Sequence, residues 1–345
     1  MDINIIGLKT HFFNENQISD KICKKKTKIV NYCFYSINEV NIANKIKKIP
    51  YYSNYYSILE DYDFINISTI REKVVEKVEL LDETKKYLLF TYKSYLSTFD
   101  DFLIEFKEPK QIIFYTISSF SYLLQSLSQL ENQNIVFFQF SSKNIVFLET
   151  CRENPLLHNF QLSLQVSKLN EEYITKIIKK TTDYSLKPLE THVLFYLIEN
   201  DMNTISYSFI EEIVEVFIKN LSILSFFTQS YRDSYQKYCV HSLQKYINKP
   251  KREIIMDILT NYDKWDIYSI SVFYLHIFAS ICNVFSLKDT FINKICIELS
   301  KNIHPDPSKR DNLAKLVEKY EKLLNCDWSF VNSLDNTKMN QLWDI

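Results

Sequence analysis

The chain of 345 residues contains a single glycine, Gly7. Average usage of about 7% would place roughly 24 glycines in a chain of this length. Glycine is the residue that lets a backbone turn at positive φ or come close to a phosphate group. The glycine-rich phosphate loops G-x-x-x-x-G-K-[ST] and G-x-G-x-x-G therefore cannot form, and functions that depend on them are excluded.

Charge and cysteine content narrow the class of protein further. There are 41 Lys and Arg against 42 Asp and Glu, a net charge of −1, which argues against a surface built for nucleic acid. The seven cysteines form no C-x-x-C pair, so free thiols in a reducing compartment are expected, with no zinc site or disulfide framework. No metal-ligand spacing is found.

The apolar run 265–278 is too short to cross a membrane and is predicted to be a buried helix. We expect an intracellular, cytoplasmic protein with no membrane contact.

Strand patterns precede helix patterns along the chain. β-branched and aromatic residues predict strands at 28–35 and 86–92, and a helix is predicted at 38–46. Two short strands are predicted within 135–148, around a polar tip. Helices are predicted at 111–130, through 191–260, at 265–278 and from Leu313 to Leu324. A capping-box pattern at 208–211 predicts a helix start at Ser208. This order predicts an α+β fold.

Five short segments carry charged, amide or proline residues at recognisable spacings. They are FFQFSSKN at 137–144, HNFQ at 158–161, KPLE at 187–190, WDIYS at 265–269 and DPSKR at 306–310. In this order they resemble the H-R-D-L-K-x-x-N, D-F-G, A-P-E, D-x-W-S and D-P-x-x-R motifs of eukaryotic-type protein kinases, in degenerate form. Residues 87–103 resemble the strand, hinge and helix that join the two kinase lobes. The resemblance covers about 87–325.

The resemblance implies a two-lobed kinase-like fold. Residues 1–92 would form a small N-lobe of strands and one helix, and 93–345 a larger helical C-lobe. Glu190 and Asp266 lie 76 residues apart, far more than the family usually has between these motifs. The extra helical stretch, about 191–260, is similar to what kinase-like proteins of large DNA viruses carry.

The resemblance implies structural roles for several residues. Glu190 and Arg310 would form a buried ion pair, and breaking such a pair typically costs about 3–5 kcal/mol. Asp266 would accept backbone N–H bonds from the loop at 137–144. Phe137, at the usual His position, and Phe160 would join an apolar spine between the lobes.

The residues at the chemical positions are altered. The resemblance places Gln139 at the catalytic Asp position and Ser141 at the catalytic-loop Lys position. Asn144 matches the metal-binding Asn, and Asn159 stands at the Asp of D-F-G. A neutral amide cannot take a hydroxyl proton as a carboxylate does, and two amides make a poor magnesium site.

Two further kinase roles fall in the N-terminal part. Glu39 is the candidate for the helix Glu that pairs with a strand Lys, and Lys26 and Lys28 are both candidates for that Lys. With the glycine loop excluded as well, ATP and Mg²⁺, the cofactors that the resemblance implies, are expected to bind weakly or not at all.

The leading prediction is a pseudokinase, a scaffold or regulator that binds a protein partner, with 191–260 as the candidate binding segment. One alternative is an atypical serine/threonine protein kinase in which Glu131, Glu149 or Asp183 replaces the missing carboxylate. Another is a structural protein of a virus, working in the host cytoplasm or the virion. Nucleotide binding and phosphotransfer are expected of the enzyme and not of the scaffold, so measuring them would distinguish the two predictions. The sequence leaves the oligomeric state open.

Overall fold

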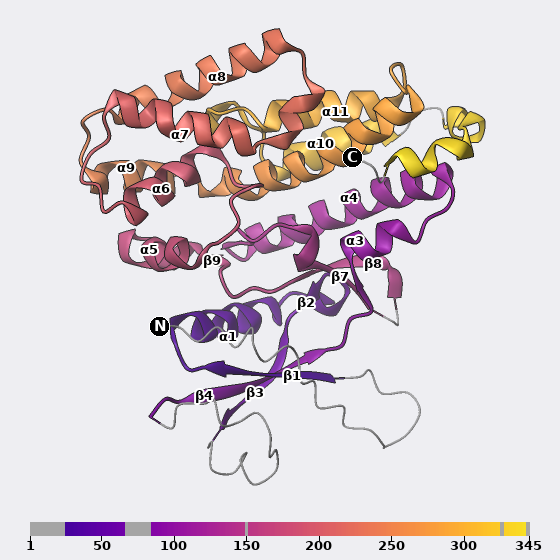
Figure 1. The fold of residues 1–345 in the computed structure, drawn as a ribbon. Coiled ribbons are helices and arrows are strands. Elements are labelled where there is room, and N and C mark those ends of the chain that lie inside the picture. The colour runs from indigo at the N-terminus through magenta and orange to yellow at the C-terminus, as the bar shows by residue number, and fades with distance from the viewer. Residues whose placement is uncertain (1–24, 66–83, 149–150, 325–327, 343–345) are drawn as a thin grey trace, which may run out of the picture.

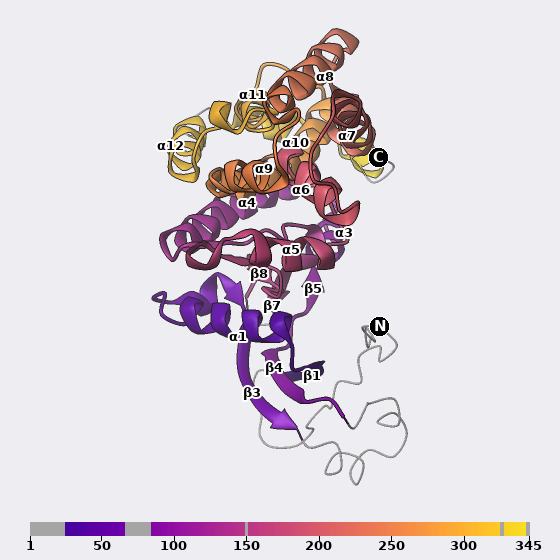
Figure 2. The same ribbon diagram turned by 90° about the vertical axis from the view of Figure 1, so that its left-hand side faces the viewer.

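The computed structural model describes residues 25–65, 84–148, 151–324 and 328–342. Three small groups of strands lie within the first half of the chain, and the part after β9 (Leu164–Gln165) is helical, so the fold is α+β. Figure 1 shows the first sheet at the bottom of the molecule and the later helices stacked above it. In the view turned by 90°, α8 lies at the top, far from that sheet (Figure 2).

The N-terminal sheet has the order β1-β4-β3, with antiparallel neighbours. Its strands are β1 (Lys25–Asn31), β3 (Leu59–Ile65) and β4 (Tyr87–Lys93). Helix α1 (Phe34–Ile46) lies between this sheet and the rest of the protein (Figure 1). The prediction of a strand at 28–35 is therefore wrong at its end, because Phe34 and Tyr35 begin the helix. Cys33 N donates to Ser36 Oγ at 2.9 Å, and this capping overrides the strand preference of the aromatic residues.

A second sheet has the order β2-β8-β7-β5. It comprises β2 (Tyr56–Ser57), β5 (Ser97–Thr98), β7 (Ile145–Leu148) and β8 (Cys151–His158). A separate pair joins β6 (Ile135–Val136) to β9 (Leu164–Gln165). The two short strands predicted within 135–148 are thus β6 and β7, but each pairs with a different strand.

Ten helices follow β5 among the described residues. They are α3 (Phe99–Ile104), α4 (Pro109–Asn132), α5 (Glu171–Lys180), α6 (Leu189–Glu199), α7 (Tyr207–Asn220), α8 (Gln229–Leu243), α9 (Lys251–Leu259), α10 (Trp265–Phe285), α11 (Phe291–Asn302) and α12 (Leu313–Leu324). The helix predicted to start at Ser208 starts one residue earlier. Ser206, in extended conformation, is its N-cap and accepts from Phe209 N at 3.4 Å.

Helix α10 runs through the core. The helical stretch Tyr262–Phe285 is long and apolar enough to cross a membrane, but 67% of its most apolar window is buried inside the protein. It is the one such stretch among the described residues. Trp265, Tyr268 and Tyr274 are among the largest fully buried side chains. The buried helix predicted at 265–278 is therefore present and extends to Phe285.

Candidate functional site

The loop from Phe137 to Asn144 follows β6 and is held by a carboxylate from α10. Asp266 Oδ2 accepts from Phe137 N at 2.6 Å, and Asp266 Oδ1 accepts from Phe138 N at 2.8 Å. Phe138 has φ 61°, a left-handed conformation that costs energy for a residue with a bulky side chain. The two bonds hold the backbone there. The contact predicted for Asp266 is present.

Burial and the groups that face Asp266 act on its pKa in opposite directions. Burial raises the pKa of Asp266 to about 6, although the two backbone N–H groups and Lys187 act to lower it. Asp266 thus stays ionised at neutral pH because the loop's N–H groups and a buried cation face it.

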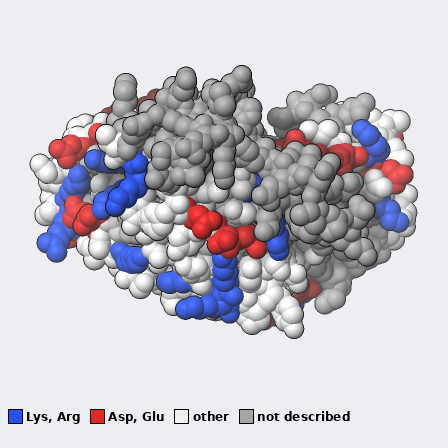
Figure 3. Space-filling model, turned by 90° about the horizontal axis from the view of Figure 1, so that it is seen from below, with Lys and Arg blue, Asp and Glu red and all other residues white. Residues whose placement is uncertain are grey.

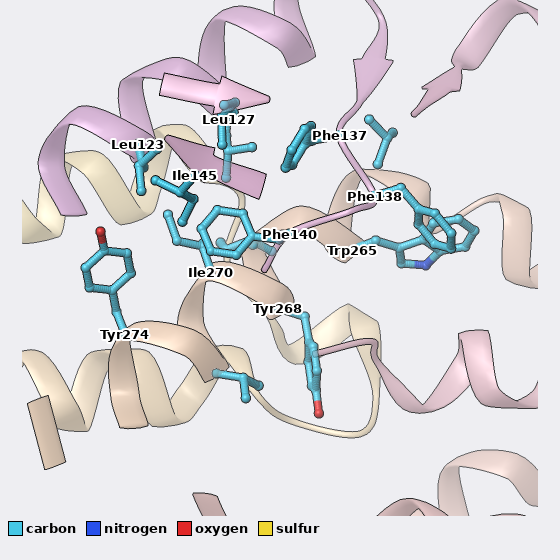
Figure 4. Close-up of a cluster of buried hydrophobic side chains, with 14 of the residues drawn as sticks. Leu123, Leu127, Phe137, Phe138, Phe140, Ile145, Trp265, Tyr268, Ile270 and Tyr274 are labelled. Carbon is cyan, nitrogen blue, oxygen red and sulfur yellow. The ribbon is translucent and has the colours of Figure 1, made fainter. Parts of the chain in front are cut away.

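The aromatic residues of the loop pack in different directions. The Phe137 ring contacts the Phe160 ring, with centroids 5.2 Å apart, and both are buried. Phe138 packs on Trp265 at 5.5 Å. Phe140 packs on Phe273 at 5.4 Å. Figure 4 shows Phe138 beside Trp265, away from Phe137 and Phe140. The loop is therefore anchored in the core at three points.

Gln139, Asn144 and Asn159 are linked by hydrogen bonds that use the side chains of both asparagines and the backbone of Gln139. Asn144 Nδ2 donates to the backbone oxygen of Gln139 at 2.7 Å, and Asn159 Nδ2 donates to Asn144 Oδ1 at 3.1 Å. Gln139 Oε1 accepts from Leu162 N at 3.0 Å. Asn159 has φ 64°, a conformation that Asn tolerates better than most residues. The structure brings all three predicted residues together, as a neutral hydrogen-bond network.

The rest of the loop adds little charge to this network. Ser141 begins the short helical turn Ser142–Asn144 in extended conformation. Ser142 Oγ donates to Asp100 Oδ2 at 2.6 Å. Lys143 is exposed. Burial acts to raise the pKa of Asp183, but hydrogen bonds from Ser185 and the charge of Lys143 outweigh it and lower that pKa. Ser141, which occupies the predicted Lys position, offers only a hydroxyl.

A buried lysine beside the loop was not singled out from the sequence. Lys187 is 4% exposed, and its Nζ lies 4.3 Å from the centroid of the Phe138 ring. Burial lowers the pKa of Lys187 to about 8, while Asp266 and Asp183 act to raise it. A desolvated cation on an aromatic face is stabilising. Lys187 therefore fastens the segment before α6 to the loop. The sequence feature that could have indicated a buried lysine is its position within the otherwise apolar stretch 186–189.

Glu39 does not form the predicted ion pair with a strand lysine. It is buried on α1 and accepts from the Tyr92 hydroxyl at 2.9 Å. Burial raises the pKa of Glu39, while Lys28 and the Tyr92 hydroxyl act to lower it. Lys28 thus affects Glu39 through its charge and not through a hydrogen bond. The Nζ of Lys26 instead lies 3.8 Å from the centroid of the Tyr95 ring.

The predicted pair of Glu190 and Arg310 forms a two-bond contact. Arg310 Nη1 donates to Glu190 Oε1 at 2.6 Å, and Nη2 donates to Oε2 at 2.9 Å. Arg310 also donates to the backbone oxygens of His304 and Pro305. Burial opposes the charge of Arg310, but Glu190 outweighs it and raises the pKa. The pair joins the start of α6 to the segment before α12.

The carboxylates proposed as replacements for the catalytic Asp lie in different places. Glu131 lines a cavity of about 140 Å³ together with Asp263 and Asp266. Burial, followed by those two carboxylates, raises the pKa of Glu131. Asp183 is exposed and accepts from Ser185 Oγ at 2.7 Å. Glu149 lies outside the described residues.

The side chains of Asn144 and Asn159 are poor ligands for the magnesium ion of Mg-ATP. Magnesium takes oxygen ligands and favours carboxylates together with phosphate oxygens. Asn144 Oδ1 already accepts a bond from Asn159, and both side chains are neutral. Within the described residues, no group of three or more His, Cys, Asp and Glu side chains is placed to hold a metal ion.

No protein-family model matches the sequence, and no curated protein matches it.

Proposed function

We propose that the protein is a kinase-like protein without phosphotransfer chemistry, which acts by binding a protein partner. Long-range contacts expected from the kinase resemblance support the fold. Asp266 holds the loop at Phe137 and Phe138, across 129 and 128 residues, and Arg310 pairs with Glu190 across 120. The sheet with α1 would be the N-lobe, and the helices from α3 onward the C-lobe.

The amide network carries the functional proposal. Phosphoryl transfer depends on a positioned base and on metal ions that neutralise developing charge. Gln139, Asn144 and Asn159 occupy the positions of the base and of the metal ligands, and they satisfy hydrogen bonds within the loop. A neutral network of this kind keeps the shape of the loop and supplies neither chemical function.

A protein partner suits the surface of the helices in 191–260. Large apolar side chains are exposed along these helices, between 37% and 55% each: Phe195, Tyr207, Val216, Tyr238 and Met256. Aromatic residues and Met are enriched in protein interfaces. The face seen from below, on the side of the N-terminal sheet, shows both acidic and basic side chains (Figure 3). The chain as a whole has 41 Lys and Arg against 42 Asp and Glu, a balance that suits a protein partner better than a polyanion.

Phosphotransfer from radiolabelled ATP tests the catalytic half of the proposal. Wild type would be assayed with Mg²⁺ and with Mn²⁺, both for autophosphorylation and for transfer to casein. The matched variant, Gln139→Asp with Asn159→Asp, restores both carboxylates. We expect wild type to stay at the level of a no-protein blank. Metal-dependent transfer by wild type would overturn the proposal.

One observation favours the atypical kinase as a second candidate. Asp183 is an exposed carboxylate; burial acts to raise its pKa, but hydrogen bonds from Ser185 and the charges of Lys187 and of Lys143 in the loop lower it. If wild type transfers phosphate, Asp183→Asn should abolish the activity. Asp233→Asn, a change at an exposed aspartate on α8, should leave it intact. Activity that survives Asp183→Asn would remove this candidate.

Site-specific photocrosslinking tests the binding half. A benzophenone amino acid would replace Tyr238 on α8 in one variant and the 81%-exposed Tyr51 in another. In cells of the natural source we expect a discrete adduct from position 238 and none from position 51. The same outcome at both positions would contradict a partner surface in 191–260.

A further inference from the structure

Two cysteine thiols meet where α10 and α11 pack side by side (Figure 1). Cys282 lies in the last turn of α10, and Cys296 lies in the middle of α11. The two side chains are hydrogen-bonded to each other. Both are half-buried, and both are free thiols, as are Cys33 before α1 and Cys239 on α8. The fold therefore brings together two reduced thiols from one helical hairpin.

The turn between the two helices fixes this contact. Cys282 is three residues before the end of α10, and Cys296 is five residues after the start of α11. At a rise of about 1.5 Å per residue, they lie about 5 Å and about 8 Å from the helix ends that face the turn 286–290. Leu287 N donates to the backbone oxygen of Cys282 at 3.0 Å, and Thr290 Oγ1 donates to the backbone oxygen of Leu287 at 3.1 Å. The hairpin thus holds both cysteines at a similar height.

The two thiols differ in acidity. The hydrogen bond with Cys296 lowers the pKa of the Cys282 thiol, although burial acts to raise it. The same bond, together with burial, raises the pKa of the Cys296 thiol. The thiolate is the nucleophilic form of cysteine, so Cys282 is the thiol that reacts first. Cysteines that respond to oxidants are typically acidic, accessible and next to a second cysteine. Half-buried Cys282, with Cys296 beside it, meets these conditions.

We propose that Cys282 and Cys296 are an oxidation site, at which hydrogen peroxide converts the two thiols into an intramolecular disulfide. The Cys282 thiolate attacks one peroxide oxygen, the O–O bond breaks, and the hydroxide that leaves takes up the proton released by Cys282. The Cys296 thiol then attacks the sulfur of the Cys282 sulfenic acid. The S–S bond forms, the S–O bond breaks, and a second water leaves with the proton of Cys296. Two thiols are oxidised, and one peroxide is reduced to two waters.

The disulfide would tie α11 to the end of α10. The two cysteines are 14 residues apart in the sequence, and closing a loop of about 15 residues restricts the unfolded chain. For a chain of this length we expect oxidation to raise Tm by about 4 °C. The hydrogen-bonded sulfurs would have to approach to about 2.0 Å to form the bond. This link does not depend on the proposed function.

Mass spectrometry of the wild-type protein tests the site. The reduced full chain would be treated with hydrogen peroxide, blocked with N-ethylmaleimide, unfolded and digested. We expect five of the seven cysteines to be alkylated, a peptide that joins Cys282 to Cys296, and loss of that peptide after treatment with dithiothreitol. Seven alkylated cysteines, oxygen added without a link, or a link between other cysteines would overturn the proposal.

Two serine variants test the order of the steps and the effect on stability. Cys296→Ser keeps the first thiol and removes the second, so dimedone should trap a sulfenic acid at Cys282, and peroxide should not raise Tm. Cys33→Ser, the matched control, changes another half-buried cysteine and should form the link as wild type does. An equal rise in Tm for wild type and a folded Cys296→Ser would overturn the proposal. If Cys296→Ser does not fold, the mapped link in wild type decides.

Discussion

The ion pair of Glu190 and Arg310 gives the sharpest prediction on stability. The two side chains are 5% and 0% exposed, and bonds of 2.6 and 2.9 Å join them. Glu190→Gln keeps the size of the side chain and removes its charge, so a buried guanidinium loses its counter-ion. Breaking a buried pair in this way typically costs about 3–5 kcal/mol.

The expected change in melting temperature follows from chain length. Unfolding entropy is roughly 2.1 cal/mol/K per residue, or roughly 0.7 kcal/mol/K for a chain of this size. Glu190→Gln should therefore lower Tm by about 4–7 °C. Scanning calorimetry and urea denaturation would measure the loss. Replacing both partners, Glu190→Leu with Arg310→Met, should cost less than the single change, because no charge is left buried.

A matched control comes from α12. Glu318 pairs with Lys322 at 2.6 Å, and both side chains are exposed. Glu318→Gln makes the same chemical change in water, so Tm should not move measurably. A loss from Glu190→Gln no larger than that of the control would refute the reasoning about the buried pair.

Two further predictions concern buried charges near the loop and α1. The folded-state pKa of Lys187 is lowered to about 8 from 10.5, so wild type should gain stability, up to about 3 kcal/mol, as pH rises from 8 to 10.5. Lys187→Met should lack this gain, and parallel stability curves for the two proteins over that range would contradict the assignment. Tyr92→Phe removes the hydroxyl that donates to buried Glu39, so urea denaturation should show a loss of about 1–3 kcal/mol at pH 7. Because burial raises the pKa of Glu39, protonation relieves the unpaired charge, and the loss should shrink as pH falls toward 4; a loss equal at both pH values would contradict this.

The sequence predicted contacts whose two partners each stand in a recognisable motif. Glu190, Arg310 and Asp266 each stand in a segment whose spacing is recognisable, so their long-range contacts could be named in advance. The helix stripes at 111–130 and 313–324 were equally readable, because their apolar spacing is local.

Other features depend on packing that no local pattern shows. Phe34 and Tyr35 end the stretch predicted as a strand, yet the capping hydrogen bond between Cys33 N and Ser36 Oγ makes them the start of a helix. The partner of Glu39 is Tyr92, which reaches it from a strand 53 residues away. The contact of Lys187 with the Phe138 ring likewise joins segments that are far apart in the sequence.

The most direct test of the central claim is nucleotide binding by the wild-type protein. Its thermal melt would be recorded alone, with ATP, with Mg-ATP and with Mn-ATP. A ligand at 100 times its Kd that binds only the folded state adds about 2.7 kcal/mol, or roughly 4 °C for this chain. With Asn159 and Asn144 bound to each other and no carboxylate at either position, we predict no shift with any of the three. A shift that requires the metal would contradict the account.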